Sequence, residues 1–360
     1  MNDWIKRNEL GTEWEPVYTK VLDHGHIGLI DFMGDDSAIV NAARVSYGKG
    51  TKAVQSDEGL IRYLMRHWHT TPFEMCDFKF HVKAPIFVFR QWHRHRTASI
   101  NEYSGRYSLL DNEMYVPDYS HTSPQARDNK QGRQDNLLEP EDYNAVRTAL
   151  EHVNETSYQT YLYLCGPTEE GGQPAAPDAL QERHKVVEQA ALNAIIKLRQ
   201  QQAYAPEEEQ IVIDEDFVES VLRDWFIQAN CHVITKEYPG IARELARMVL
   251  PVSTYSQMYW KANLHNIMHF MRLRADPHAQ YEIRVYAEAM MEMIRPIVPM
   301  AIKAFEDYQL RASHLSRMET ELVRAARAGT IDITKNDAVE EFLKGAGCSS
   351  REIAEFIKRF

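Results

Sequence analysis

Arginine side chains gather in one short stretch of an otherwise acidic chain. The 17 residues from 90 to 106 contain four arginines, Arg90, Arg94, Arg96 and Arg106, and only one carboxylate, Glu102. The whole chain has a formal net charge of −11. Guanidinium groups bind phosphate oxygens in a bidentate manner. The alternative is a solvated basic surface or a set of intramolecular ion pairs, which is the usual role of an isolated Arg-x-Arg. The density of arginines directly after an apolar segment favours an anion site.

The residues between these arginines add polar groups of the kind that contact a ligand. Residues 99–105, SINEYSG, supply hydroxyl groups, an amide and a glycine, and His93 and His95 lie just upstream. Glycine allows a ligand to approach the backbone closely. Together these residues predict a pocket for a phosphorylated small molecule.

A second group of polar side chains lies far downstream, in a stretch that we predict to be helical over 261–273. His265, His269 and Arg272 are spaced i, i+4, i+7 and share one helix face. The opposite face carries Leu264, Ile267, Met268 and Met271. His-x-x-x-His could be a metal pair, but no acidic residue lies between the histidines and no clear third ligand is near. Contact with a cofactor or an anion is therefore favoured, and we expect no metal.

Length and composition exclude several classes of protein. A chain of 360 residues, 44% hydrophobic and 26% charged, forms one large domain or two ordinary ones. It has no apolar run of about 18 residues and no secretory signal, so we expect no membrane association. The negative net charge argues against nucleic-acid binding. The four cysteines have no Cys-x-x-Cys spacing and are typical of reduced thiols, which predicts a cytoplasmic location.

No glycine-rich nucleotide motif is present. The sequence has no G-x-G-x-x-G, no P-loop and no G-x-S-x-G. Any nucleotide cofactor is therefore held without a Rossmann glycine turn.

The elements that would position these side chains are mainly helical, with strands near the N-terminus. We predict strand structure over 17–33 and over 78–84, where apolar residues alternate with Lys79, His81 and Lys83. Residues 86–95 are predicted to be helical after Pro85, with a buried strand as the alternative, and to lead into a loop at 97–105. The fold class is therefore α+β.

Helix caps and apolar periodicity predict the remaining helices. Asp35-Asp36-Ser37 and Ser56-Asp57-Glu58 would begin the first two, Asp276 would cap a later one, and Ser349 with Glu352 would form a capping box near the C-terminus. The predicted helices span 38–46, 57 to before Pro72, 139–164, 182–202, 216–231, 240–250, 261–273 and 277–295, with two short ones after 337.

The arginine-rich stretch resembles a known signature. Arg94-His95-Arg96 followed by Ser99, Asn101, Glu102, Ser104 and Arg106 is similar to the motif of the flavin-dependent thymidylate synthases, the ThyX family. Segments AARVSY (42–47), HWHTTPFE (67–74), ARMVLP (246–251) and NLHNIMHFMRLRADPHAQYEI (263–283) also look like family segments. The resemblance covers roughly residues 17–117 and 238–308.

This resemblance implies a fold and a reaction. The fold would be helix-rich α+β with a small, mostly antiparallel sheet, assembled as a homotetramer whose active sites form where subunits meet. The reaction would be reductive methylation of dUMP to dTMP. The carbon donor would be 5,10-methylenetetrahydrofolate, FAD would relay the hydride, and NADPH would be the reductant. The phosphate of dUMP would account for the arginines.

The resemblance also implies roles for individual residues. Arg274 is the catalytic candidate, since it would stabilise negative charge developing on the uracil ring. Ser104 would contact a ligand and not act as a nucleophile, because no base is paired with it. The residues implied for dUMP are Gln91, Arg94, Glu102, Tyr103, Ser104, Gly105, Arg106, Arg247 and Arg274. Those implied for FAD are Ser46, His69, Thr71, Arg94, His95, Arg96, Glu102, Asn263, His265 and His269.

Two segments depart from a minimal family member. Residues 118–237 are longer than the expected linking helices and predict a peripheral helical insertion within a catalytic domain at 1–310. Residues 311–360 predict a C-terminal helical extension. Two other functions stay open: a ThyX-like hydroxymethyltransferase acting on a pyrimidine nucleotide, and a non-catalytic nucleotide- or flavin-binding protein.

Overall fold

The computed structural model describes residues 6–7, 14–15, 17–46, 56–127, 132–167, 178–202, 212–228 and 239–359. The chain divides into two compact units, Met1–Ile302 and Lys303–Phe360. The described residues of the first unit form helices and two antiparallel sheets, of five and two strands, which confirms the predicted α+β class. Among the described helices, none is both long and apolar enough to cross a bilayer.

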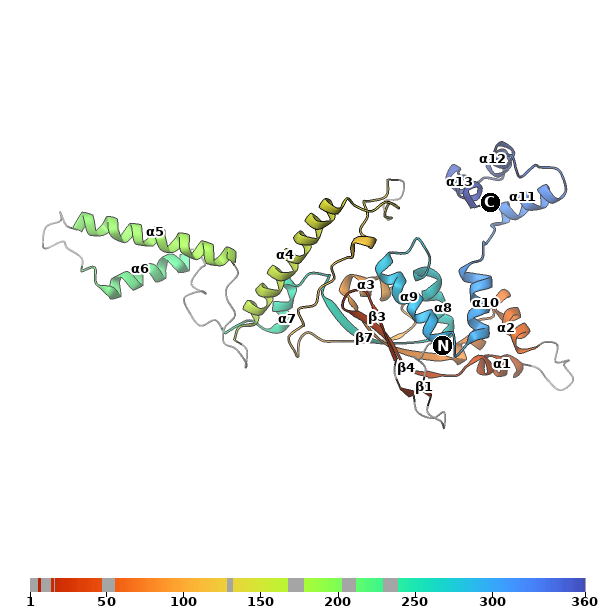
Figure 1. Cartoon of the computed structure of the whole chain (residues 1–360), viewed down its shortest axis with the longest axis horizontal. Helices are drawn as coiled ribbons and strands as arrows, with labels where there is room; N and C mark the ends of the chain where they lie inside the picture. Colours follow the sequence, from red (N-terminus) through yellow and green to blue (C-terminus); the bar gives the residue numbers. More distant parts are fainter. Residues whose placement is uncertain are drawn as a thin grey trace. The chain divides into compact units, whose positions relative to one another are not determined.

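The centre of the first unit is a five-stranded antiparallel sheet (Figure 1). Its strand order is β3 (Val17–Val21), β4 (Gly25–Met33), β5 (Asp77–Pro85), β7 (Tyr255–Asn263) and β6 (Ser99–Glu102). The predicted alternation in β5 is confirmed, since every second residue is buried. A separate pair, β1 (Lys6–Arg7) and β2 (Trp14–Glu15), precedes this sheet in the sequence.

Three helices pack on the sheet and are joined by a cluster of aromatic rings. These helices are α3 (Ile86–Trp92), α8 (Leu264–Arg274) and α9 (Tyr281–Ile294). The indole of Trp92 lies 4.6 Å from the ring of Phe270, 5.7 Å from that of Trp260 and 6.0 Å from that of Tyr286, between ring centroids. All four side chains are buried. Because such aromatic contacts are well packed, they fix the end of α3 against α8 and α9.

The first two helices begin where the sequence predicts. Asp35 accepts hydrogen bonds from the amides of Ser37 (2.9 Å) and Ala38 (3.3 Å) at the start of α1 (Asp36–Arg44). Ser56 caps α2 (Asp57–Arg66), which the 3₁₀ helix η1 (Thr71–Met75) follows. The Asp36 carboxylate, in turn, accepts from the amides of Met300 and Ala301 at the start of α10 (Pro299–Phe305).

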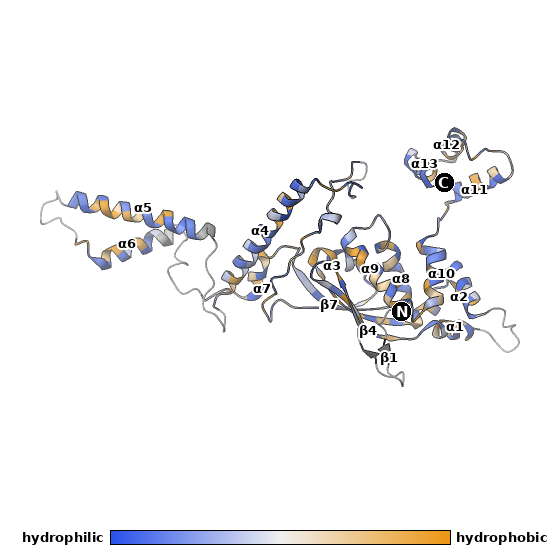
Figure 2. Cartoon of the chain, viewed as in Figure 1, coloured by the Kyte–Doolittle hydropathy of each residue, from blue (hydrophilic) through white to orange (hydrophobic). Residues whose placement is uncertain are grey.

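Between β6 and β7, most of the residues that the structure describes are helical. This segment contains η2 (Tyr119–His121), α4 (Pro140–Cys165), α5 (Asp178–Gln202), α6 (Glu215–Gln228), α7 (Arg243–Ala246) and the 3₁₀ helix η5 (Arg247–Val249). Helices α5 and α6 pack against each other, and hydrophobic and hydrophilic residues are interspersed along both (Figure 2). Residues 168–177, which are rich in glycine and proline, and Cys231 lie outside the described residues.

The second unit has a small core of its own. After the π-helical turn η6 (Glu306–Leu310) come α11 (Arg317–Arg327), α12 (Asn336–Gly345) and α13 (Ser350–Arg359). Their core consists of Leu322, Val339, Leu343, Ile353 and Phe356. The predicted capping box is confirmed, because the Ser349 amide donates to Glu352 (2.7 Å) and the Glu352 amide donates to the Ser349 hydroxyl (3.4 Å).

Four predicted element bounds were wrong. Residues 99–102 form the edge strand β6 and are not a loop, and Lys261–Asn263 end β7 instead of beginning a helix. Helix α9 begins at Tyr281, not at Pro277, because the Asp276 carboxylate accepts from the His278 amide (2.8 Å) and forms a turn. The helix predicted over 240–250 is a short α-helix followed by a 3₁₀ turn.

Candidate active site

The candidate site is built where the end of α8 meets the end of α3. Arg274, the last residue of α8, donates from Nε to Nε2 of His95 (3.1 Å) and from Nη2 to the backbone oxygen of Gln91 (3.3 Å). The last carbonyl groups of a helix lack partners within the helix, so the oxygen of Gln91 is a ready acceptor for a cation. The structure thus brings together four of the predicted residues, Gln91, Arg94, His95 and Arg274.

His95 serves Arg274 as a neutral acceptor. Its side chain is buried, and its ring makes edge contacts with the rings of His269 (5.7 Å) and Phe270 (4.9 Å). Burial, together with the nearby charges of Arg274 and His269, lowers the pKa of His95 to about 4. A neutral imidazole leaves a lone pair on Nε2, and that lone pair accepts the hydrogen bond from Arg274.

The arginines of this region have no carboxylate partners. Burial and the nearby charge of Arg94 lower the pKa of Arg274. Among described residues, the arginine–carboxylate ion pairs all involve other arginines. The arginines that the sequence singled out form no ion pair with a described carboxylate: Arg90, Arg94, Arg96, Arg106, Arg247 and Arg274. Ion pairs among the described residues therefore do not explain these arginines, and Arg94 and Arg274, which lie near each other, can neutralise an external anion.

Strand β6 and the following loop hold the residues after the basic motif. The Glu102 carboxylate accepts from the hydroxyl of Ser256 (2.9 Å) and lies 3.7 Å from Nε2 of His93. The Ser104 hydroxyl accepts from Nε of Arg106 (3.1 Å). Tyr103 is exposed, whereas Gly105 is buried.

Gly105 has a packing role that the sequence did not reveal. A Cβ atom at this position would lie 3.1 Å from Cδ1 of Leu110. The absence of a side chain thus lets the loop pack on Leu110, whereas the sequence suggested close approach of a ligand. The amide of Tyr103 donates to the oxygen of Gln257 (2.7 Å) and ties the start of this loop to β7.

The remaining predicted residues lie on neighbouring elements. Asn263 caps α8 by accepting a hydrogen bond from the amide of Asn266 (3.0 Å). His265 and His269 lie on the less buried face of this helix, as predicted. The opposite face is buried and carries Leu264, Ile267, Met268 and Met271. Thr71 begins η1, which packs against α8, and exposed His69 precedes it. Exposed Ser46 follows α1. Exposed Arg96 follows His95 in the chain.

Two predicted nucleotide contacts are not joined to this centre. Arg247, on η5, donates to the oxygen of Glu244 (3.4 Å), and Arg106 bonds to Ser104. Within the described part of one chain, no hydrogen bond links either of them to Arg274. Their roles stay predictions.

Sequence reasoning missed the residues directly behind Gln91. The Gln91 side chain donates to Gln280, which donates to the buried Glu282, and Glu282 also accepts from Arg133 and Tyr115. No spacing rule joins these positions, because Arg133 and Glu282 are 149 residues apart in the sequence. The only available signal was the position of Gln280 and Glu282 within the family-like segment HAQYEI.

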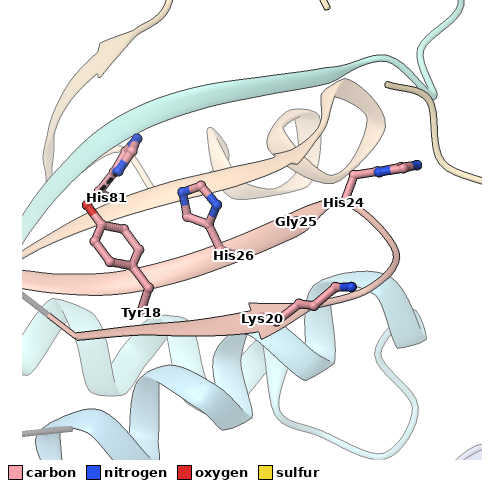
Figure 3. Close-up of a pocket in the computed structure, with 6 residues that line it drawn as sticks. All are labelled: Tyr18, Lys20, His24, Gly25, His26 and His81. Carbon is pink, nitrogen blue, oxygen red and sulfur yellow. Dashed lines mark hydrogen bonds between the residues drawn. The ribbon is translucent and has the colours of Figure 1, made fainter. Parts of the chain in front are cut away.

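A separate hollow of about 500 Å³ lies on the sheet, and no predicted site residue lines it (Figure 3). Its walls carry Tyr18, His26 and His81, with the Tyr18 hydroxyl 2.9 Å from Nδ1 of His81. Burial lowers the pKa values of both histidines. Among the residues described, no group of three or more His, Cys, Asp or Glu side chains could hold a metal ion.

The lowered pKa of His95 predicts acid sensitivity. The folded state binds this proton only near pH 4, whereas the unfolded chain binds it near 6.5, so stability present above pH 6.5 is lost as the pH falls toward 4. We expect Tm to fall over this range, and less steeply in His95→Asn, because an amide oxygen still accepts from Arg274 but does not titrate. Thermal unfolding at a series of pH values measures this. An equal slope in both proteins would contradict it.

Comparison with known proteins assigns the family. A family described as "Thymidylate synthase complementing protein" matches residues 28–300. The flavin-dependent thymidylate synthase of Rickettsia bellii is 45% identical over 316 residues, which cover 88% of this chain and 86% of that protein. The enzyme of the same name from Ruegeria pomeroyi is 44% identical over 336 residues, covering 93% and 85%.

A solved structure supports the same assignment. The UMP/dUMP methylase PolB from Streptomyces cacaoi, crystallised with 5-Br UMP, is 28% identical and superimposes with a TM-score of 0.53, over 81% of this chain and 97% of that chain. Its complex with 5-Br dUMP superimposes equally well. Together with the sequence relatives, this likeness confirms the resemblance that the Arg94–Arg106 motif suggested. The chain belongs to the thymidylate synthase complementing protein (ThyX) family of flavin-dependent thymidylate synthases.

Proposed function

We propose that this chain converts dUMP to dTMP by reductive methylation, with 5,10-methylenetetrahydrofolate as carbon donor, FAD as hydride relay and NADPH as reductant. The observation that carries the proposal is the setting of Arg274. Its guanidinium group is held by two neutral acceptors, beside Arg94 and without a carboxylate partner among the described residues. A cation oriented in this way is suited to an anionic nucleotide.

Arg274 would act on the uracil ring by electrostatic stabilisation. C5 of uracil attacks a carbon electrophile only when the ring becomes electron-rich, and a fixed guanidinium stabilises the negative charge that then develops. Addition of a cysteine thiolate to C6 is the other way to activate the ring. Burial, and the nearby carboxylates of Asp35, Asp36 and Asp77, raise the pKa of buried Cys76 to about 12, so this thiol stays protonated.

The donor set also fits FAD. Exposed Arg94 and Arg96 offer guanidinium groups for a diphosphate, and α8 presents His265 and His269 on the face away from its buried residues. Bound flavin would supply the hydride that completes the methyl group. We propose Ser46, His69, Thr71, Asn263 and Glu102 as further flavin contacts. For dUMP we propose Gln91, Tyr103, Ser104, Gly105, Arg106 and Arg247, besides Arg94 and Arg274.

We further propose that a homotetramer completes each site. Support comes from the exposure of Arg106 and Arg247 and from the lack of a bond between either of them and Arg274 within the described residues of one chain. A cytoplasmic location is supported by the described cysteines, Cys76, Cys165 and Cys348, which are all free thiols.

Product analysis tests the reaction. Purified protein supplied with FAD, NADPH, 5,10-methylenetetrahydrofolate and dUMP is expected to form dTMP, identified by chromatography and mass spectrometry. UMP is assayed in parallel. A hydroxymethylated nucleotide would instead support the hydroxymethyltransferase. Binding of FAD and dUMP without any product or NADPH oxidation would support the non-catalytic alternative.

A further inference from the structure

A buried carboxylate lies behind the candidate site. Glu282, in the first turn of α9, is 2% exposed, and both of its oxygens accept hydrogen bonds. Nη2 of Arg133 lies 2.6 Å from Oε1 and 2.7 Å from Oε2, the Tyr115 hydroxyl lies 3.1 Å from Oε1, and Nε2 of Gln280 lies 2.8 Å from Oε2. Such full hydrogen bonding holds a buried carboxylate in one orientation.

Arg133 comes from the segment that the sequence predicts to be a peripheral insertion. Its Nη1 donates to the backbone oxygen of His121 (2.6 Å), and the ring of His121 stacks on that of Tyr281 with centroids 3.6 Å apart. This part of the long segment therefore docks on the start of α9, where Gln280 is the N-cap residue.

The chemistry of these groups fixes the direction of each hydrogen bond. An ionised carboxylate only accepts, so Gln280 must turn its NH₂ group to Glu282 and its carbonyl oxygen to Gln91. The Gln91 amide must then turn its NH₂ group to Gln280. One N–H and the carbonyl oxygen of Gln91 are left for a ligand in a single orientation, and the backbone oxygen of Gln91 accepts from Arg274.

We propose that Glu282 and Gln280 are positioning residues for the nucleotide, acting as a relay that fixes the side-chain amide of Gln91 beside Arg274, with Arg133 neutralising the carboxylate. This inference rests on the proposed function, because it takes dUMP as the ligand. In Glu282→Gln the side chain is neutral and both donates and accepts, so the amide groups of Gln280 and Gln91 can flip. The effect falls on dUMP affinity and not on FAD.

The relay is tested in the FAD-bound protein by comparing Gln280→Ala, Glu282→Gln and the double variant. Gln280 is exposed and makes no side-chain cap, so its truncation preserves folding. We expect each single variant to raise KM and the calorimetric Kd for dUMP about tenfold, the worth of one oriented hydrogen bond. FAD content should stay unchanged. The double variant should bind dUMP as tightly as either single variant, because the two substitutions break the same relay.

Arg147→Gln is the matched control, because Arg147 forms an exposed ion pair with Glu151 (2.7 Å) in α4, and it should behave as wild type. Unchanged dUMP affinity in Gln280→Ala, or additive losses in the double variant, would overturn the relay. A lower Tm with unchanged KM in Glu282→Gln would do the same and leave a purely structural role. Wild-type protein that binds dUMP but forms no dTMP would refute the proposed reaction, while the affinity measurements still decide on the relay.

Discussion

Replacing Arg274 with alanine is expected to reduce thymidylate formation about 1,000-fold in kcat, because the variant loses the cation that stabilises charge on the uracil ring. The FAD content of the purified protein should remain, since the proposed flavin contacts lie on other side chains. In this variant, Nε2 of His95 and the backbone oxygen of Gln91 each lose the hydrogen bond that Arg274 donates. The steady-state rate of dTMP formation at saturating substrates gives kcat, and FAD absorbance of the same sample gives the flavin content.

Arg274→Lys separates charge from geometry. A lysine keeps the positive charge but cannot reproduce a planar fork that bonds His95 and Gln91 together, so we expect activity between those of wild type and the alanine variant. Arg147→Ala, in an exposed ion pair on α4, is the control for loss of an arginine. Wild-type turnover in Arg274→Ala would remove Arg274 from its proposed role.

Local patterns predicted the elements whose signals are complete within a few residues. The alternation in β5, the Asp35 and Ser56 caps and the Ser349–Glu352 box each depend on neighbours close in the sequence. The basic motif was equally local, and both its arginines and its resemblance were read without a structure. Because these features depend only on residues close in the sequence, they can be predicted from the sequence alone.

Strand β6 was missed because nothing in its own sequence marks it as a strand. All four of its residues are exposed, and it is held at the sheet edge by backbone pairing with β7. Strand β7 was obscured for a different reason. It ends at Asn263, which is also the cap of α8, so the helical period of α8 was extended three residues too far into the strand.

The relay behind Gln91 could not be predicted, because it depends on tertiary contacts. Arg133 looked like one more charge in a long polar segment, and Glu282 like a first-turn helical carboxylate. Only the docking of the segment on α9 buries Glu282 and pairs it with Arg133. Within the predicted insertion, His121 and Arg133 therefore contact α9 directly behind Gln91.

Loss of Arg133 is expected to cause a large change in stability. Arg133→Met leaves the Glu282 carboxylate buried without its cation, which costs about 3 kcal/mol of unfolding free energy at neutral pH. This is the lower end of the usual range, because the Arg133 side chain is 36% exposed and water screens the pair. Urea unfolding at pH 7 measures the loss, and Arg147→Met serves as the control.

The pH dependence of this loss identifies its cause. Burial alone would raise the pKa of Glu282, but the hydrogen bonds and charge of Arg133, with the hydrogen bond from Gln280, hold it below its usual value. The folded wild type therefore keeps the Glu282 carboxylate ionised. The stability that this carboxylate contributes is lost only as the pH falls through its lowered pKa. In Arg133→Met the carboxyl group instead takes up a proton readily. The difference in unfolding free energy between Arg133→Met and wild type should consequently decrease as the pH is lowered from 7 to 5. A gap independent of pH would mean that Arg133 contributes through packing of its side chain and not through its charge.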